Sequence, residues 1–140
     1  MIPALLRLRD AGYEFVMVTN QDGRGTPAFP EAAFQEVQDF VLRLFASQGI
    51  SFSRVFVCPH RPEDRCTCRK PNPGHLGDFL ATVNIDRQAS FVAGDRNTDL
   101  EFARNIGVQG FQVDPQDPES WGRIAHAVVD RPRTATVLRQ

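Results

Sequence analysis

The sequence lacks the features of several protein classes. No apolar run in the 140 residues approaches the ~18 residues of a membrane-spanning helix. The N-terminus has no long apolar stretch followed by a small-residue cleavage site, as a signal peptide would. The formal net charge of −1 gives no support for a nucleic-acid or anionic-membrane surface. We therefore expect neither nucleic acid nor membrane as a partner.

Cysteine is scarce, and all three cysteines stand close together as Cys58, Cys66 and Cys68, with His60 between them. Zn²⁺ prefers such a Cys₃His set, and four protein ligands leave no open position, so a zinc ion here would be structural. Three reduced cysteines in a loop are the alternative, since an odd number cannot pair completely. Thiols kept for a metal, with no export signal, indicate a cytoplasmic protein.

Lysine is scarcer still, because Lys70 is the single lysine among sixteen basic residues. Lys70 comes two residues after the last cysteine. A metal ion bound by the cysteines would therefore make this loop rigid and hold the Lys70 ammonium in a defined position. Lysine binds phosphate as a point charge. A solvated surface lysine is the alternative interpretation.

Apolar spacing predicts helices that alternate with strands. The helices are expected over residues 3–10, 30–48, 76–83, 100–106 and 121–129, and the strands over 14–18, 52–57, 89–93 and 110–113. The second helix should be amphipathic, with apolar residues from Phe34 to Phe45 at three- and four-residue spacing. The alternation predicts one open parallel sheet with flanking helices, an α/β domain over 1–130. Residues 131–140 are expected to be a linker or a frayed tail.

Polar clusters follow the predicted strands, where α/β sheets of this kind bind ligands. Thr19 and Asn20 supply a hydroxyl, an amide and backbone N–H groups that could hold a phosphoryl oxygen. A plain turn is the alternative, because these residues favour turns.

Asp95 and Asp99 stand four residues apart across a strand end and the start of a helix. Mg²⁺ takes hard oxygen ligands from one or two carboxylates, water and phosphate. The alternative is that Asp99 only sits favourably in the first helical turn while Asp95 caps the helix. Taken together, the hydroxyl, the lone ammonium and the paired carboxylates predict a Mg²⁺-phosphate site.

Three segments resemble motifs two, three and four of the haloacid-dehalogenase phosphatases: 18–23, 58–71 and 94–99. The cysteine loop narrows the resemblance to the branch of histidinol-phosphate and heptose-bisphosphate phosphatases. Residues 19–26 with Phe29 and Pro30 are most similar to the phosphatase half of the bifunctional histidine-biosynthesis enzymes.

The resemblance implies Mg²⁺ and Zn²⁺ as cofactors and assigns a role to each candidate residue. Thr19 and Asn20 would contact the phosphoryl group, and Lys70 would neutralise it, so Lys70 and Thr19 form the catalytic set. Asp95 would bind Mg²⁺ and Asp99 would support that metal. The zinc ligands of the family match Cys58, His60, Cys66 and Cys68 one for one.

Motif one of the family, Asp-x-Asp-x-Thr, has no counterpart in the 140 residues. In the family it supplies the nucleophile and the acid/base aspartate, on a central strand between those that here end at Thr19 and Asp95. We therefore expect an N-terminally truncated domain, with Met1 an internal methionine or a fragment boundary, inactive and poorly stable by itself. Residues 131–140 resemble the start of the joint to a dehydratase domain.

Three functions remain open from the sequence. The first is hydrolysis of histidinol phosphate, a small phosphomonoester, through an aspartyl-phosphate in the intact protein. The second keeps this chemistry with a heptose bisphosphate as substrate. The third is a non-catalytic, zinc-stabilised domain that binds phosphate and hydrolyses nothing.

Overall fold

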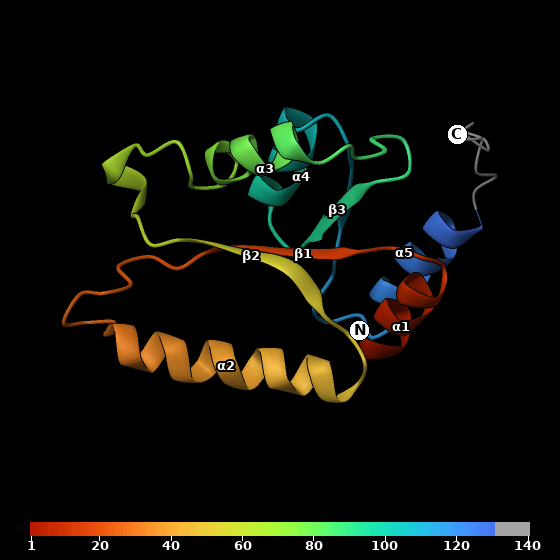
Figure 1. The fold of residues 1–140 in the computed structure, drawn as a ribbon, viewed down its shortest axis with the longest axis horizontal. Coiled ribbons are helices and arrows are strands. Elements are labelled where there is room, and N and C mark those ends of the chain that lie inside the picture. Colours follow the sequence, from red (N-terminus) through yellow and green to blue (C-terminus); the bar gives the residue numbers. More distant parts are fainter. Residues whose placement is uncertain (131–140) are drawn as a thin grey trace.

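The computed structural model describes residues 1–130, as helices and strands that alternate along the chain (Figure 1). The α-helices are α1 Ile2–Asp10, α2 Glu31–Ser47, α3 Gly77–Thr82, α4 Asn97–Asn105 and α5 Ser120–Val129. The strands are β1 Phe15–Asn20, β2 Phe52–Cys58, β3 Phe91–Gly94 and β4 Gln109–Gln112. Short 3₁₀ turns span Pro62–Asp64 and Gly74–Leu76. The predicted alternation is confirmed, and the predicted tail, 131–140, lies outside the described residues.

Strand β1 is longer than predicted, and the extension matters for the site. Thr19 and Asn20 pair in parallel register with Val57 and Cys58 of β2. A plain turn at Thr19 and Asn20 is therefore wrong: both residues belong to the end of a hydrogen-bonded strand, whose ladder fixes their backbone.

Both strand pairs are parallel, as predicted, but they do not form one sheet. β1 pairs with β2, β3 pairs with β4, and no ladder joins the pairs within residues 1–130. Val18 of β1 and Val92 of β3 nevertheless pack against the same buried cluster around Phe102. The break thus lies between β1 and β3, at the place where the family resemblance puts a further central strand.

Two apolar clusters cover opposite faces of the strands. The larger one joins α1, α5 and the C-terminal end of α2, through residues such as Leu8, Phe45 and Ile124. The smaller one joins α3 and α4 through Phe102 and its neighbours. Figure 1 accordingly shows α2 on one side of β1 and β2, and α3 and α4 on the other. The result is a three-layer α/β arrangement.

Helix α2 buries less of its apolar surface than its spacing predicts. Phe34 and Phe45 are buried, whereas Val37, Phe40 and Leu44 are 62%, 61% and 45% exposed. Successive helical residues are ~100° apart, so these two stripes face different directions. Phe45 packs against Phe52 of β2 and Phe34 against Phe29, whereas the other stripe stays largely exposed. Among residues 1–130, no helix is both long enough and apolar enough to span a membrane.

Candidate functional site

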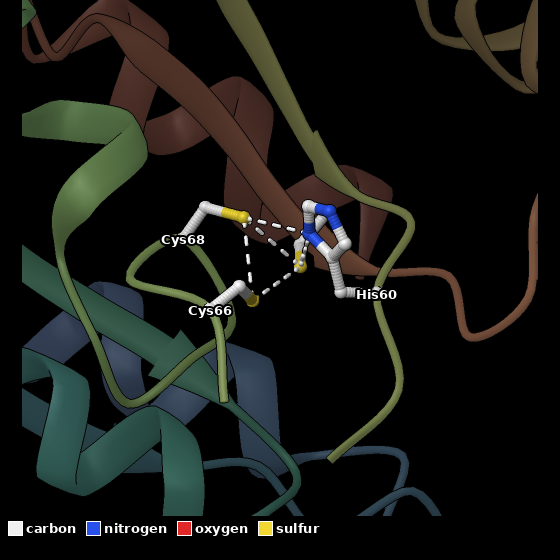
Figure 2. A group of neighbouring side chains, drawn as sticks. His60, Cys66 and Cys68 are labelled. Atoms are coloured by element: carbon white, nitrogen blue, oxygen red, sulfur yellow. Dashed lines mark hydrogen bonds between the residues drawn. The ribbon is translucent and has the colours of Figure 1, made fainter. Parts of the chain in front are cut away.

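The cysteines and His60 converge at the end of β2. Cys58 is the last residue of that strand and is buried, and His60 follows two residues later. After the 3₁₀ turn at Pro62–Asp64, the chain returns and brings Cys66 and Cys68 back to the same place. Figure 2 shows the sulfur atom of Cys68 next to the imidazole of His60, with the sulfur atom of Cys66 joined to that of Cys68.

The ligand atoms of this cluster are spaced as a tetrahedral metal site requires. All four lie within 4.8 Å of one another. The Cys58 Sγ is 3.7 Å from Cys66 Sγ and 3.3 Å from Cys68 Sγ, and the His60 Nδ1 is 3.2 Å from Cys68 Sγ. Metal–sulfur bonds of ~2.3 Å in a tetrahedron give edges of about 3.8 Å, so the donor set and its spacing fit a metal such as zinc.

The three thiols differ in acidity because their surroundings differ. Burial raises the pKa of the Cys58 thiol. Burial, and then hydrogen bonds to Cys58 and Cys66, raise the pKa of Cys68 to about 12. Burial also opposes ionisation of Cys66, but hydrogen bonds from Cys68 Sγ and from the Arg69 and Cys68 backbone outweigh it and lower the Cys66 pKa to about 7. Without a metal, the cluster therefore holds roughly one thiolate or less at neutral pH.

Arg69 joins this cysteine loop to the loop that follows β1. Its guanidinium pairs with the Asp22 carboxylate, with one Nη2–Oδ2 distance of 3.1 Å, and donates to the His60 carbonyl at 2.9 Å. The side-chain bond to Asp22 raises the pKa of Arg69 further above its usual value. The backbone N–H of Gly23 also donates to the Pro59 carbonyl at 2.9 Å. The two loops thus hold each other in place.

A hollow of about 300 Å³ opens beyond the carboxyl ends of β1 and β3. It gathers every residue that the sequence predicts for phosphate and magnesium, although these residues come from three separate segments. Its lining consists of Thr19, Asn20, Gln21, Lys70, Asp95, Arg96, Thr98 and Asp99.

Lys70 reaches into this hollow from the loop after the cysteine cluster. Its Nζ donates to the Val18 carbonyl at 2.8 Å and to Asp99 Oδ1 at 2.7 Å. The two side chains of this ion pair are only 15% and 6% exposed, so water screens the pair poorly. The alternative interpretation, that Lys70 is a solvated surface lysine, is therefore wrong.

Asp99 has two contacts that fix it at the start of α4. Besides Lys70, its Oδ2 accepts a hydrogen bond from the Arg96 backbone N–H at 3.1 Å, in the manner of a capping box. The alternative in which Asp95 caps this helix is wrong, because Arg96 occupies the N-cap position, whereas Asp99 does lie in the first turn as that alternative expected. Both Asp99 oxygens are thus engaged, whereas the exposed Asp95 carboxylate has no ion-pair or hydrogen-bond partner among residues 1–130.

Gly94 makes room for the Asp99 carboxylate at the end of β3. A Cβ at position 94 would overlap Asp99 Oδ2 and Cγ far more closely than real atoms approach. The segment 94–99 therefore requires a residue without a side chain at position 94, in addition to its two carboxylates.

The sequence analysis did not predict that Gln21, Arg96 and Thr98 line the hollow. Their position beside or between predicted site residues was the only sequence signal for them. Gln21 donates from Nε2 to Thr19 Oγ1 at 3.0 Å, so the single hydroxyl proton of Thr19 is directed elsewhere. Arg96 and Thr98 line the hollow between the two predicted aspartates. Thr19 thus keeps a hydroxyl donor for a bound oxygen atom.

Comparisons with known proteins agree with this geometry. The sequence model of the HAD-hydrolase-like family matches residues 67–130. The chain is 47% identical over 140 residues to the histidine biosynthesis bifunctional protein HisB of Legionella pneumophila (strain Lens), covering all of this chain and 39% of that protein. It is 47% identical over 144 residues to HisB of Xylella fastidiosa (strain 9a5c), covering 99% of this chain and 38% of that protein.

A solved structure gives the fold-level comparison. It is a D,D-heptose bisphosphate phosphatase from B. bronchiseptica, complexed with magnesium and phosphate, and it superposes with a TM-score of 0.70 at 31% identity, over 94% of this chain and 72% of that one. The chain therefore belongs to the haloacid-dehalogenase-like phosphatases. It spans about two fifths of the length of the HisB relatives.

The cysteine cluster predicts a pH dependence of metal binding. Because Cys58 and Cys68 have raised pKa values and Cys66 one of about 7, a thiolate-bound metal must displace roughly two to three protons at pH 7. Zinc affinity should therefore rise with pH from about 6 to 8, as measured by competition with a chromophoric chelator. An affinity that is independent of pH would show that the thiols are not the ligands.

Gly94→Ala tests the packing of Asp99. We expect it to lower the free energy of unfolding by about 1–3 kcal/mol, since the added methyl displaces a buried side chain. Gly77→Ala is the matched control, because a Cβ there meets no atom within 4 Å. Equal effects in urea unfolding curves would contradict this interpretation of Gly94.

Proposed function

We propose that the chain is the phosphatase domain of a longer bifunctional histidine-biosynthesis protein and that its substrate is histidinol phosphate. The observation that carries this proposal is 47% identity, over the whole chain, to proteins named as histidine biosynthesis bifunctional proteins. The heptose-bisphosphate alternative has support from one structural neighbour at 31% identity, which is the weaker similarity.

In this proposal the hollow receives the phosphoryl group. The Lys70 ammonium stabilises its negative charge, and the Thr19 hydroxyl donates a hydrogen bond to one of its oxygens. Asp95 is the carboxylate that would hold Mg²⁺, because it lines the hollow and has no other partner among residues 1–130, while Asp99 holds Lys70. When bound, Mg²⁺ supplies electrostatic stabilisation of the phosphoryl oxygens.

The attacking group must come from outside these 140 residues. They contain no Asp-x-Asp pair, and covalent phosphoryl transfer needs a positioned nucleophile. We propose that a further strand with two aspartates fills the break between β1 and β3. There, its carboxyl end would meet the hollow that Thr19 and Lys70 line.

Cys58, His60, Cys66 and Cys68 are proposed to hold a structural zinc ion. Their donor atoms and spacing support this role. A dehydratase domain in the full-length protein is a further proposal, supported by the share of the HisB relatives that the chain leaves uncovered. Reduced thiols and a biosynthetic role lead us to propose a cytoplasmic location.

The zinc proposal predicts about one zinc ion per chain in the purified protein. Cys66→Ser should lower both the zinc content and the melting temperature, because the free energy of binding a structural metal contributes to folding. Glu63→Gln, a change at an exposed residue of the same loop, is the control and should leave both unchanged. Atomic emission and thermal unfolding give the two readouts, and full zinc occupancy in a Cys58/Cys66/Cys68 triple serine variant would reject the site.

The catalytic proposal is tested by adding the upstream coding sequence. The 140-residue chain should release no phosphate from histidinol phosphate, whereas a protein with an added Asp-x-Asp strand should do so in the presence of Mg²⁺. Lys70→Ala in that protein should cost about 3–4 kcal/mol of transition-state stabilisation, because it removes a charge aimed at the phosphoryl group.

Arg104→Ala, a change to an exposed cation in the last turn of α4, is the control for Lys70→Ala. Faster turnover of a heptose bisphosphate would favour the second substrate. Phosphate binding without turnover of either compound would favour a non-catalytic domain. Metal-dependent turnover by the 140-residue chain itself would mean that the nucleophile has been misplaced.

A further inference from the structure

The side-chain amide of Asn20 contacts the backbone of Lys70 on both sides. Asn20 Oδ1 accepts from the Lys70 backbone N–H at 3.0 Å, and Asn20 Nδ2 donates to the Lys70 carbonyl at 3.3 Å. The two residues are 50 positions apart in the sequence. One side chain thus pairs both backbone groups of Lys70, as a neighbouring strand would.

Asn20 is itself a fixed anchor. It is the last residue of β1 and pairs in register with Cys58 of β2. The loop that carries Lys70, in contrast, has no strand partner around that residue. The Asn20 amide therefore ties the backbone of Lys70, a loop residue, to the hydrogen-bonded end of strand β1.

The two ends of Lys70 are held by different groups, and the backbone end determines where the side chain starts. The ammonium reaches the Val18 carbonyl and Asp99 through a stem of four methylene groups. Such a stem has many rotamers, so a fixed backbone limits the positions that the ammonium can adopt. A shift of the backbone would move the charge relative to both Asp99 and the hollow.

We propose that Asn20 is a positioning residue, whose amide fixes the backbone of Lys70 so that the ammonium faces the phosphoryl site. That the ammonium faces a phosphoryl site rests on the proposed phosphatase function. The contact between Asn20 and Lys70 does not depend on that function. The sequence suggests that Asn20 contacts phosphate, but in the structure its amide is committed to Lys70.

Asn105 provides a matched control in the same region. Its Nδ2 donates to the carbonyl of Pro71, the residue after Lys70, at 2.8 Å. Asn105→Ala therefore also deletes an amide bond to this loop, but it leaves both backbone bonds of Lys70 in place.

The experiment uses Lys70 as its own reporter, because it is the only lysine in the 140 residues. Protein grown with ¹³C-labelled lysine gives a single set of lysine side-chain signals, and these report the folded-state environment of Lys70. The rate at which an amine-reactive ester modifies Lys70, followed by peptide mass spectrometry, reports how often the ammonium leaves its partners.

Asn20→Ala should move the lysine ε-methylene signal and raise the Lys70 modification rate roughly tenfold, as expected for the loss of two hydrogen bonds. Asn105→Ala should leave the signal in place and change the rate by less than about twofold. Asn20→Asp keeps the shape and the acceptor but loses the donor, so its rate should be intermediate; it also serves if Asn20→Ala fails to fold. Mere global destabilisation lowers the melting temperature without moving the signal of the folded state.

An unchanged Lys70 signal and rate in the folded Asn20 variants would overturn the proposal. Equal shifts in the Asn20 and Asn105 variants would also overturn it, because the effect would then belong to any bond to this loop. These readouts need no turnover, so failure of the phosphatase proposal and failure of the Asn20 proposal are distinguishable.

Discussion

The position of the Lys70 ammonium is the constraint on which the rest of the site depends. It lies between the Val18 carbonyl and the Asp99 carboxylate, in a place from which water is largely excluded. An unpaired charge in such surroundings is costly, so each partner has to be in place for the other. This single contact therefore requires the end of β1, the first turn of α4 and the loop after the cysteine cluster to meet at one point. The same requirement explains why Gly94 has no side chain.

The cysteine cluster matters because the loop that leads from β2 to Lys70 has no buried residue between positions 59 and 69. The 3₁₀ turn at Pro62–Asp64 buries no residue, so hydrophobic packing cannot fix this loop. The cluster of Cys58, His60, Cys66 and Cys68 and the Arg69–Asp22 ion pair connect it instead to β2 and to the loop after β1. In the proposed holo form the metal is thus remote from the chemistry, yet it determines the path by which the only lysine reaches the hollow.

Sequence reasoning succeeded where the signal is local. Cys58 through Cys68 lie within one loop. Thr19 and Asp95 each follow a predicted strand, and Lys70 ends the loop that follows a third one. Because ligands bind at the carboxyl ends of parallel strands, the sequence predicted that these three residues lie together. Sequence reasoning failed for contacts between segments that are far apart in the chain. The amide bonds from Asn20 to Lys70 join residues 50 positions apart, and no spacing in the sequence marks them. The exposed stripe of α2 was missed because periodicity shows that a face is apolar, but not whether a sheet is wide enough to cover it.

The charges around the hollow bear on how it would treat a phosphate ester. Lys70 and Arg96 bring two positive charges, and Asp95 and Asp99 bring two negative ones, so the lining has no net formal charge. Moreover, the Lys70 charge is already balanced by Asp99. A phosphomonoester that carries nearly two negative charges at neutral pH would gain little from such a lining and would be repelled by the exposed Asp95. A divalent cation bound to Asp95, as proposed, would turn that repulsion into attraction. We therefore expect the proposed Mg²⁺ to strengthen the binding of the phosphoryl group as well as to assist its cleavage.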